Sequence, residues 1–149
     1  MMPPVIRRQP QVVQPPATGG KPKVLVIDDD KGIRTLLDAL LTRNGFDVTL
    51  AASGDEGYEL FKKAPAGTFA VVLCDRKCDP IHEDRNQGDE VISGIKRIDP
   101  SQKVIMGATG ASRLSIAEVV AIGADAYVDK PFQIKQLVEK ITELTKTKV

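Results

Sequence analysis

Three apolar runs of this 149-residue chain each end in carboxylates or a lysine. Asp28-Asp29-Asp30 follow the first run, Asp75 follows the second, and Lys130 follows the third. Carboxylates that are packed together repel one another and cost stability unless a cation lies among them. Mg²⁺ suits such an oxygen-rich site, because it binds one or two carboxylates and keeps several of its waters. The residue types therefore favour a magnesium site, provided that the fold brings the three runs together.

A metal ion and a lysine beside an aspartate are the parts of a phosphoryl-transfer site. Lys130 would pair with a phosphoryl oxygen as a point charge. Together with the metal ion it would neutralise the charge of the phosphoryl group in transfer, which is the main catalytic task of this chemistry. A central carboxylate can act as the nucleophile and form an aspartyl-phosphate.

Strands and helices that could position these residues alternate along the chain. Short apolar runs rich in β-branched residues predict strands, and apolar residues at helical spacing predict amphipathic helices. Five strands alternating with five helices predict an α/β fold, with a doubly wound five-stranded parallel sheet and helices on both faces. The expected strands cover 24–27, 46–50, 69–74, 104–106 and 126–128, and the expected helices cover 33–41, 53–64, 91–98, 114–122 and 132–146.

Parallel strands predict where the polar groups meet. Their carboxyl ends share one edge of the sheet, and ligands bind at that edge near a topological switch point. Asp28, Asp29, Asp75 and Lys130 would therefore converge there.

Helix-end signals support this alternation of elements. Asp30 is well placed to cap the first helix, and Ser53 with Glu56 has the spacing of a capping box before the second. Gly123 has the residue type that closes a helix in the left-handed conformation.

Residues 1–22 differ in composition from the rest, since they hold six of the ten prolines. Such a segment cannot bury enough apolar surface to offset the entropy of ordering it. We expect a disordered, Pro-rich tail over residues 1–22, one domain over 23–146, and a short C-terminal tail over 147–149.

The composition argues against several classes of function. Apolar residues make up 42% of the chain and charged residues 28%, a balance typical of soluble globular proteins. The net charge of +1 creates no field that would attract nucleic acid or an anionic membrane. No stretch approaches the roughly 18 apolar residues that cross a bilayer. Cys74 and Cys78, the two cysteines, fit a reducing cytoplasm better than a disulfide framework.

Residues 23–146 resemble the receiver domain of bacterial two-component response regulators, and the chemotaxis regulators in particular. The resemblance implies a flavodoxin-like (βα)5 sheet in the strand order 2-1-3-4-5. It also implies a phosphorylation-dependent signalling switch that phosphorylates itself and turns over no free substrate. The motifs that carry it occur in the family's order: Val24-Leu25-Val26-Ile27-Asp28-Asp29-Asp30, then Asp75, then Gly123-Ala124-Asp125-Ala126-Tyr127, then Lys130-Pro131-Phe132.

By this resemblance each candidate residue takes a role. Asp75 would be both phosphoacceptor and metal ligand. Asp28 and Asp29 would be the acidic pair that binds Mg²⁺, with Asp29 the more direct ligand. The backbone carbonyl of Lys77 would be the third protein ligand, and Lys130 would bind the phosphoryl group.

The resemblance leaves one position open at the end of the fourth strand, where the family has a Thr or Ser that hydrogen-bonds a phosphoryl oxygen. Counting back from Lys130 without a gap gives Ala108, which cannot make that bond. A shift of one residue gives Thr109, which we favour because the chemistry needs a hydroxyl. Tyr127 resembles the family's switch aromatic, whose ring changes orientation when the site is occupied.

The segment after Asp75 departs from the family pattern. Residues 76–87 form a longer connection than usual without a Met-Pro pair, and Lys77 places a cation beside the site. Cys74, Cys78 and His82 recur at a spacing of four, which could suggest zinc. We do not favour zinc, because Cys74 should point into the core and His82 should lie in a solvated loop.

Two other functions stay open. Asp28 and Asp30 form an Asp-x-Asp after the first strand, as in haloacid-dehalogenase-like phosphatases, where they would be nucleophile and acid; those enzymes usually have a cap domain and a longer chain. A phosphate-independent interaction module on the receiver fold is the second.

The expected partners follow from the leading hypothesis of a switch. A histidine kinase or histidine phosphotransfer protein would donate the phosphoryl group. The downstream effector protein is not indicated by the sequence. We expect the chain to be a stand-alone receiver or a piece of a longer protein.

Overall fold

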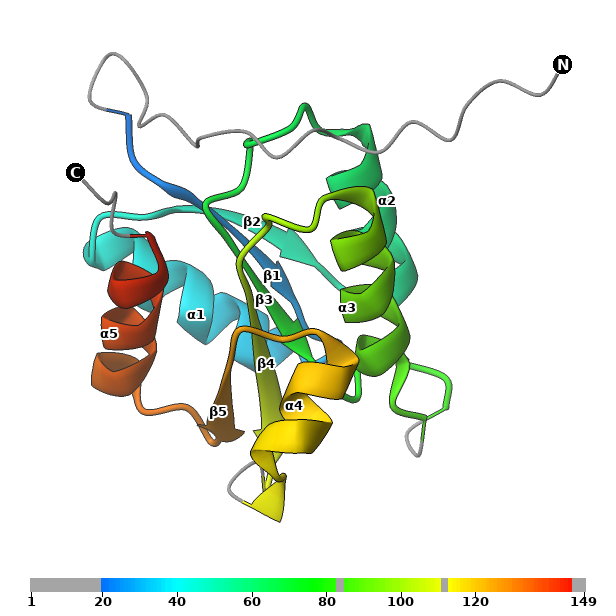
Figure 1. The fold of residues 1–149 in the computed structure, drawn as a ribbon. Coiled ribbons are helices and arrows are strands. Elements are labelled where there is room, and N and C mark those ends of the chain that lie inside the picture. Colours follow the sequence, from blue (N-terminus) through cyan, green and yellow to red (C-terminus); the bar gives the residue numbers. More distant parts are fainter. Residues whose placement is uncertain (1–19, 83–84, 111–112, 146–149) are drawn as a thin grey trace, which may run out of the picture.

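The computed structural model describes residues 20–82, 85–110 and 113–145, and Figure 1 shows strands and helices alternating along them. The predicted tails at 1–22 and 147–149 lie outside the described residues, apart from 20–22. The strands are β1 (Lys23–Ile27), β2 (Asp47–Ala51), β3 (Val71–Asp75), β4 (Val104–Thr109) and β5 (Ala126–Lys130). The helices are α1 (Lys31–Arg43), α2 (Gly54–Lys63), α3 (Gln87–Ile98), α4 (Ile116–Ile122) and α5 (Ile134–Thr145).

The five strands form one parallel sheet in the order β2-β1-β3-β4-β5. This order confirms the predicted doubly wound, flavodoxin-like fold. The chain reverses direction across the sheet between β1 and β3, which is where such folds bind ligands.

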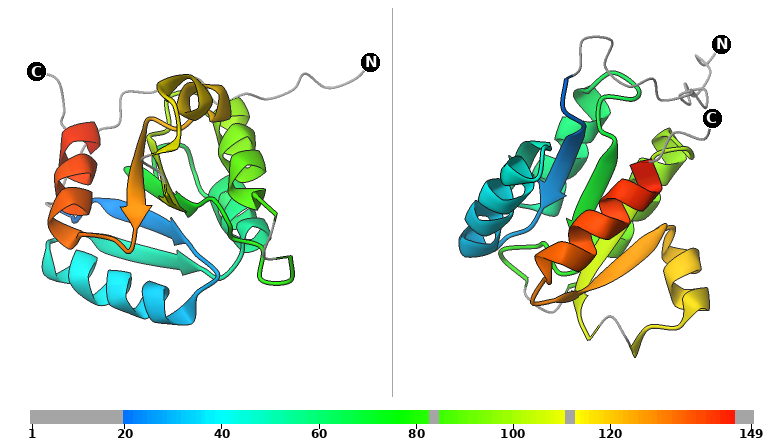
Figure 2. Two further views of the ribbon diagram at one scale, coloured as in Figure 1. Left: turned by 90° about the horizontal axis from the view of Figure 1, so that it is seen from below. Right: turned by 90° about the vertical axis from the view of Figure 1, so that its left-hand side faces the viewer.

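Two apolar layers cover the two faces of the sheet. Successive side chains of a strand point to opposite faces, so each strand supplies both layers. In Figure 2, α1 and α5 lie on one side of the sheet, and α2, α3 and α4 lie on the other. Buried residues of the first layer include Val24, Val26, Leu37, Leu41, Leu137 and Ile141, and those of the second include Leu25, Ile27, Phe61, Ile92, Ile95 and Met106.

Three predicted helix ends are confirmed. A side-chain oxygen of Asp30 accepts a hydrogen bond from the Ile33 amide at 3.1 Å, and the Ser53 hydroxyl accepts one from the Glu56 amide at 3.1 Å. Gly123 ends α4 with φ at 102°, a left-handed conformation that suits glycine.

The structure extends several elements beyond their predicted limits, including three near the site. Strand β4 continues to Thr109 and β5 continues to Lys130, and α3 begins at Gln87 rather than near residue 91. The sequence pattern stopped where the apolar residues stopped, whereas the backbone pairing of β4 with β5 continues through polar side chains. Lys130 is therefore held by the sheet itself and not by the loop after it.

The amino-terminal edge of the sheet contains matched polar contacts. A side-chain oxygen of Asp125 accepts hydrogen bonds from the Val104 amide at 2.8 Å and from Lys96 Nζ at 2.7 Å. The buried Gln102 amide donates to the carbonyls of Phe69 and Lys103 at 3.0 and 3.1 Å. These contacts tie the ends of the strands to α3 and to one another. Within the described residues, no helix has the length and apolar character needed to cross a membrane.

Candidate functional site

Lys130 joins two aspartates at the carboxyl-terminal edge of the sheet. Its Nζ lies 3.0 Å from Asp28 Oδ2 and 3.1 Å from Asp75 Oδ2. These residues end or follow β1, β3 and β5, of which β1 and β3 are adjacent and β4 lies between β3 and β5, and they are separated by up to 102 positions in the sequence. The structure therefore brings Asp28, Asp75 and Lys130 together at the edge where the sequence predicted that the strand ends would meet.

Burial places these carboxylates in an unfavourable electrostatic setting. Asp28 is 2% exposed and Asp75 is 5% exposed. Burial is the main cause that raises the pKa of Asp75 to about 6, and the Asp28 carboxylate adds to it. Burial and Asp28 likewise raise the pKa of Asp29. Burial acts to lower the pKa of Lys130, but the carboxylates, Asp75 first, outweigh it, and the pKa is raised. The positive charge of Lys130 thus does not fully offset burial and the repulsion among the carboxylates, because the pKa values of Asp75 and Asp29 stay raised.

The acidic group has the composition of a divalent-cation site. Asp28, Asp29 and Asp75 each offer a carboxylate oxygen that lies within 4.8 Å of those of the other two. Three carboxylates with one ammonium leave an excess of negative charge, and a hard cation with oxygen ligands would remove it. The residues present therefore fit Mg²⁺.

The turn after β3 contains one carbonyl that accepts no hydrogen bond from the described residues. The carbonyl of Arg76 accepts from the Gly88 amide at 2.9 Å, and that of Cys78 accepts from the Gly54 amide at 3.1 Å. The Lys77 amide donates to Asp75 Oδ1 at 3.4 Å, but within the described residues its carbonyl accepts no hydrogen bond. Lys77 is exposed and its amide contacts Asp75, so its carbonyl is available to a ligand beside the acidic group.

The loop between β1 and α1 is fixed by a residue that the sequence analysis did not single out. Arg34 donates from its guanidinium to the backbone carbonyl of Asp28 at 2.9 Å, and the Asp30 amide donates to Asp28 Oδ1 at 2.9 Å. Nothing in the periodicity of α1 distinguishes this arginine from a solvated one. The carboxylate of Asp30 caps α1 and is not part of the acidic group, which disfavours its use as a phosphatase acid.

Comparison with known proteins decides the family. The sequence profile described as "Response regulator receiver domain" matches residues 24–142, which is most of the chain. The chain belongs to the response regulator receiver domain family. Proteins of this family are phosphorylation-dependent signalling switches rather than enzymes that turn over a free substrate, and they use Mg²⁺ at an acidic pocket.

Two relatives show how far the similarity extends. The receiver domain is 28% identical over 125 residues to chemotaxis protein CheY of Thermotoga maritima, covering 83% of this chain and 98% of that protein. It is 32% identical over 124 residues to the probable transcriptional regulator ycf27 of Porphyridium aerugineum, covering 81% of this chain and 47% of that protein. The chain thus spans almost all of the first relative and about half of the second.

Solved structures agree with this assignment. A response regulator receiver domain protein from Clostridium thermocellum has a TM-score of 0.71 at 29% identity, covering 83% of this chain and 94% of that chain. Chemotaxis response regulator CheY4 of Vibrio cholerae has a TM-score of 0.70 at 26% identity, covering 83% of this chain and 98% of that chain.

The end of β4 in this receiver domain holds both candidates for the hydroxyl position. Ala108 is buried and pairs with Asp129, whereas Thr109 is exposed and pairs with Lys130. Side chains of paired residues in a parallel sheet lie on the same face, so Thr109 shares the face of Lys130. Within the described residues, no hydrogen bond joins the Thr109 hydroxyl to the acidic group.

Tyr127 lies away from the acidic group. It pairs with Met106 in the sheet and packs, partly buried, against the apolar layer under α2, α3 and α4. Tyr127 is the second residue of β5. Its ring therefore lies on the side of the sheet that α4 covers.

The described residues of the connection between β3 and α3 form several contacts around Asp79. Asp79 Oδ1 accepts from the amides of Ile81 and His82 at 2.9 and 3.2 Å. Asp79 Oδ2 contacts His82 Nδ1 at 3.1 Å and Arg85 NH1 at 3.3 Å. Cys74 and Cys78 are both fully buried in the apolar layer, and the exposed His82 pairs with Asp79. Within the described residues the metal-compatible group is therefore the aspartate group, not a zinc site.

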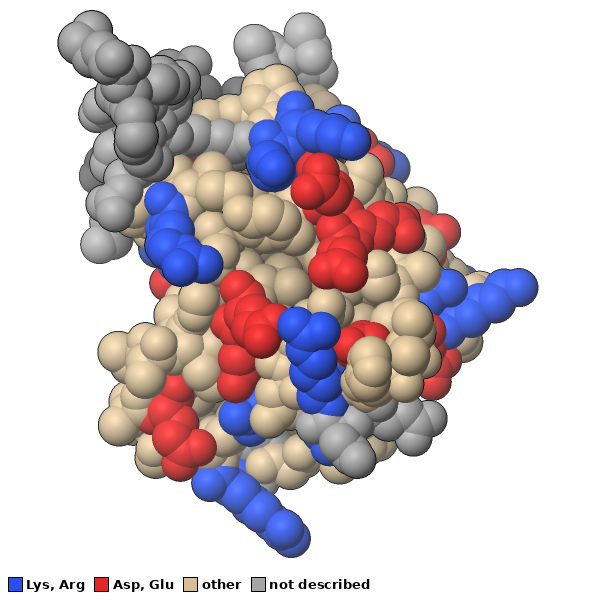
Figure 3. Space-filling model, turned by 90° about the vertical axis from the view of Figure 1, so that its right-hand side faces the viewer, with Lys and Arg blue, Asp and Glu red and all other residues tan. Residues whose placement is uncertain are grey.

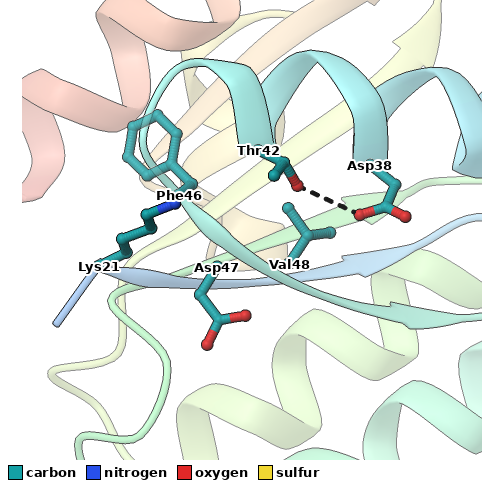
Figure 4. Close-up of a pocket in the computed structure, with 6 residues that line it drawn as sticks. All are labelled: Lys21, Asp38, Thr42, Phe46, Asp47 and Val48. Carbon is teal, nitrogen blue, oxygen red and sulfur yellow. Dashed lines mark hydrogen bonds between the residues drawn. The ribbon is translucent and has the colours of Figure 1, made fainter.

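Other surface features lie away from this site. A pocket at the opposite end of α1 is lined by residues of both charges, and Figure 4 shows the hydrogen bond that the Thr42 hydroxyl donates to Asp38 in its lining. The pocket is lined by Lys21, Asp38, Thr42, Phe46, Asp47 and Val48.

The face that carries α2 and α3 has acidic and basic side chains interspersed, so no single sign of charge dominates it (Figure 3).

Proposed function

We propose that Asp75 accepts a phosphoryl group from a histidine kinase or a histidine phosphotransfer protein, with Mg²⁺ as the cofactor. The observation that carries this proposal is the contact of Lys130 Nζ with both Asp28 and Asp75 at the carboxyl edge of the sheet. A buried nucleophile with a cation and further carboxylates around it is the arrangement that transfer to a carboxylate needs.

Asp75 and Lys130 would carry the transfer itself. An Asp75 oxygen attacks phosphorus while the bond to the donor nitrogen breaks and the donor histidine keeps the electron pair. Lys130 already contacts this carboxylate, so its ammonium is in reach of an oxygen of the phosphoryl group once that group is attached. Burial keeps water away from the nucleophile, which strengthens these charge interactions.

Asp28, Asp29, Asp75 and the carbonyl of Lys77 would hold the cofactor. When bound, Mg²⁺ supplies positive charge that stabilises the phosphoryl oxygens in transfer. The Asp28 carboxylate also accepts from the Asp30 amide, and Arg34 fixes its carbonyl, so this ligand is oriented before the cofactor arrives.

Thr109 and Tyr127 would report occupation of the site. The Thr109 hydroxyl is the candidate donor to a phosphoryl oxygen, with Ala108 as the position that offers none. The phosphorylated state would then be selected through a small shift of the face formed by α4, β5 and α5, on which Tyr127 lies. We place the exchange in the cytoplasm, because two free, buried thiols fit a reducing compartment.

Acetyl phosphate with Mg²⁺ tests the proposal, read out by intact mass. The wild type should gain one phosphate that hydroxylamine removes, and Asp75→Asn should gain none. Asp125→Asn is the matched control, because it changes a carboxylate that also contacts a lysine but at the other edge of the sheet; it should gain one phosphate as the wild type does. Failure of the wild type to form an adduct at any Mg²⁺ concentration would contradict the proposal.

A further inference from the structure

The turn that joins β3 to the long connection is anchored on both sides of Lys77. On the near side, the Arg76 guanidinium makes two hydrogen bonds to Asp89 at 3.0 and 3.2 Å. On the far side, Cys78 is fully buried and its carbonyl accepts from Gly54 at the start of α2. The position of the Lys77 carbonyl therefore depends on what holds the residues that flank it.

Asp79 fixes the far side of this turn. Its side chain is 8% exposed, and both of its oxygens are used. Oδ1 accepts hydrogen bonds from the backbone amides of Ile81 and His82, which closes a tight turn. Oδ2 contacts Nδ1 of His82 and NH1 of Arg85.

Arg85 connects this turn to α3. Its NH1 lies 3.3 Å from Asp79 Oδ2, and its NH2 lies 2.6 Å from Glu90 Oε2 in the first turn of the helix. A second contact is made with α2, because the side-chain amide of Gln87 donates a hydrogen bond to Asp55 Oδ1 at 3.2 Å. The described residues of this connection thus contact the amino ends of two helices, and α3 starts directly against the turn.

We propose that Asp79 and Arg85 are positioning residues for the divalent-cation site, acting through the backbone of the turn that ends in the Lys77 carbonyl. The contacts of Asp79 and Arg85 then pre-organise a ligand and set the affinity for the cation. The inference rests on the proposed function, because it takes the Lys77 carbonyl as a ligand. Groups that orient metal ligands without touching the metal commonly change affinity by about 10-fold or more when they are removed.

Direct binding of Mn²⁺ to the unphosphorylated full chain, followed by electron paramagnetic resonance, is the test. Mn²⁺ stands in for Mg²⁺ as a hard cation with the same oxygen ligands. Asp79→Ala removes all four contacts and should weaken binding by about 10-fold. Asp79→Asn keeps an acceptor for the Ile81 and His82 amides, so it should lose less, as should Arg85→Gln.

Asp125→Asn is the control variant for a general loss of stability. It disturbs a carboxylate that also accepts one backbone amide and one cationic side chain, but at the far edge of the sheet. It should leave the Mn²⁺ affinity unchanged. Urea unfolding of every variant checks that each one is folded, and the partly exposed Arg85 keeps the test usable if Asp79→Ala does not fold.

The possible results separate this inference from the proposed function. Wild-type affinity in Asp79→Asn and Arg85→Gln, or an equal loss in Asp125→Asn, would overturn the positioning role while leaving the site intact. Absence of Mn²⁺ binding and of an acetyl phosphate adduct in the wild type would instead remove the proposed function, and the inference with it. Graded weakening in the order Asp79→Ala, then Asp79→Asn and Arg85→Gln, with the control unchanged, supports it.

Discussion

The two edges of the sheet use the same kinds of charged residue in opposite ways. At the amino edge, Asp125 has one lysine and one backbone amide, and Asp47 has Lys23 at 4.0 Å. At the carboxyl edge, three aspartates lie together, and Lys130 contacts the carboxylates of two of them. The first edge is electrically balanced within the protein, and the second is balanced only if something positive is added.

This difference separates residues that stabilise the fold from residues that serve the site. The pKa of Asp75 is raised to about 6, which means that its ionised form is disfavoured in the folded protein. A carboxylate whose ionised form is disfavoured does not stabilise the folded state, and groups with perturbed pKa values cluster at functional sites. The carboxylates at the carboxyl edge therefore lower the free energy of unfolding, and a bound cation would raise it again.

Removal of Lys130 should have the largest effect on stability. Lys130→Met leaves two buried carboxylates without their shared cation and should cost about 3 to 5 kcal/mol in EDTA at pH 7.5. Lys96→Met removes the partner of Asp125, whose side chain is more exposed, and should cost about 1 kcal/mol. Urea unfolding measures both, and equal losses would mean that the two edges do not differ as described.

Neutralising one carboxylate at each edge should change stability in opposite directions. Asp75→Asn should stabilise the protein in EDTA at pH 7.5 by about 2 to 3 kcal/mol, because the shift from 3.8 to about 6 disfavours the charged form by roughly 1.4 kcal/mol per pH unit. Asp125→Asn should destabilise it by about 1 kcal/mol, because it weakens a satisfied contact. Loss of stability in Asp75→Asn would contradict the electrostatic account.

The pH dependence of the same contribution has a definite sign. The folded protein holds the Asp75 proton more tightly than the unfolded chain does, so stability falls as the pH rises from 3.8 to about 6 and then levels off. Asp75→Asn should remove this component. Mg²⁺ at ten times its dissociation constant should add about 1.4 kcal/mol to the wild type at pH 7.5 and less to the variant. Urea titrations over this pH range, with EDTA or Mg²⁺, measure both effects.

The smallest effect is expected at Asp30, which lies beside the site without belonging to it. Asp30→Asn keeps the side-chain acceptor that caps α1, so stability should change by less than about 0.5 kcal/mol. Phosphorylation by acetyl phosphate should stay within about twofold of the wild type, since Asp30 transfers no proton in a receiver domain. Loss of turnover of a generic phosphomonoester in this variant would instead favour the phosphatase alternative.

Local periodicity was sufficient to predict a parallel α/β sheet whose strand ends share one edge, whereas the strand order 2-1-3-4-5 came from the resemblance to receiver domains. Apolar runs such as Val24 to Ile27 are continuous because both faces of the strand are buried, and this pattern is visible without any knowledge of distant contacts. Once the strands are parallel, Asp28, Asp75 and Lys130 must end at one edge. That part of the site follows from the order of the elements alone.

The residues that hold the site in shape were not predictable in this way. Arg34 contacts a backbone carbonyl, and Asp79 gathers two amides and two side chains through a turn, and neither contact leaves a periodic trace in the sequence. The early start of α3 was missed for a similar reason. Gln87 and Gly88 are polar or small, yet both are buried by contacts with α2 and with the end of β3.

Gly88 also limits where this protein can tolerate a change in length. A side chain there would collide with the backbone carbonyl of Asp75 and with Arg76, so the first turn of α3 rests directly on the chain that follows the nucleophile. The Arg76 carbonyl and the Gly88 amide are joined across this contact. Insertions and deletions between these two residues are thereby separated from the backbone of Asp75, but they would still alter the turn that carries the Lys77 carbonyl.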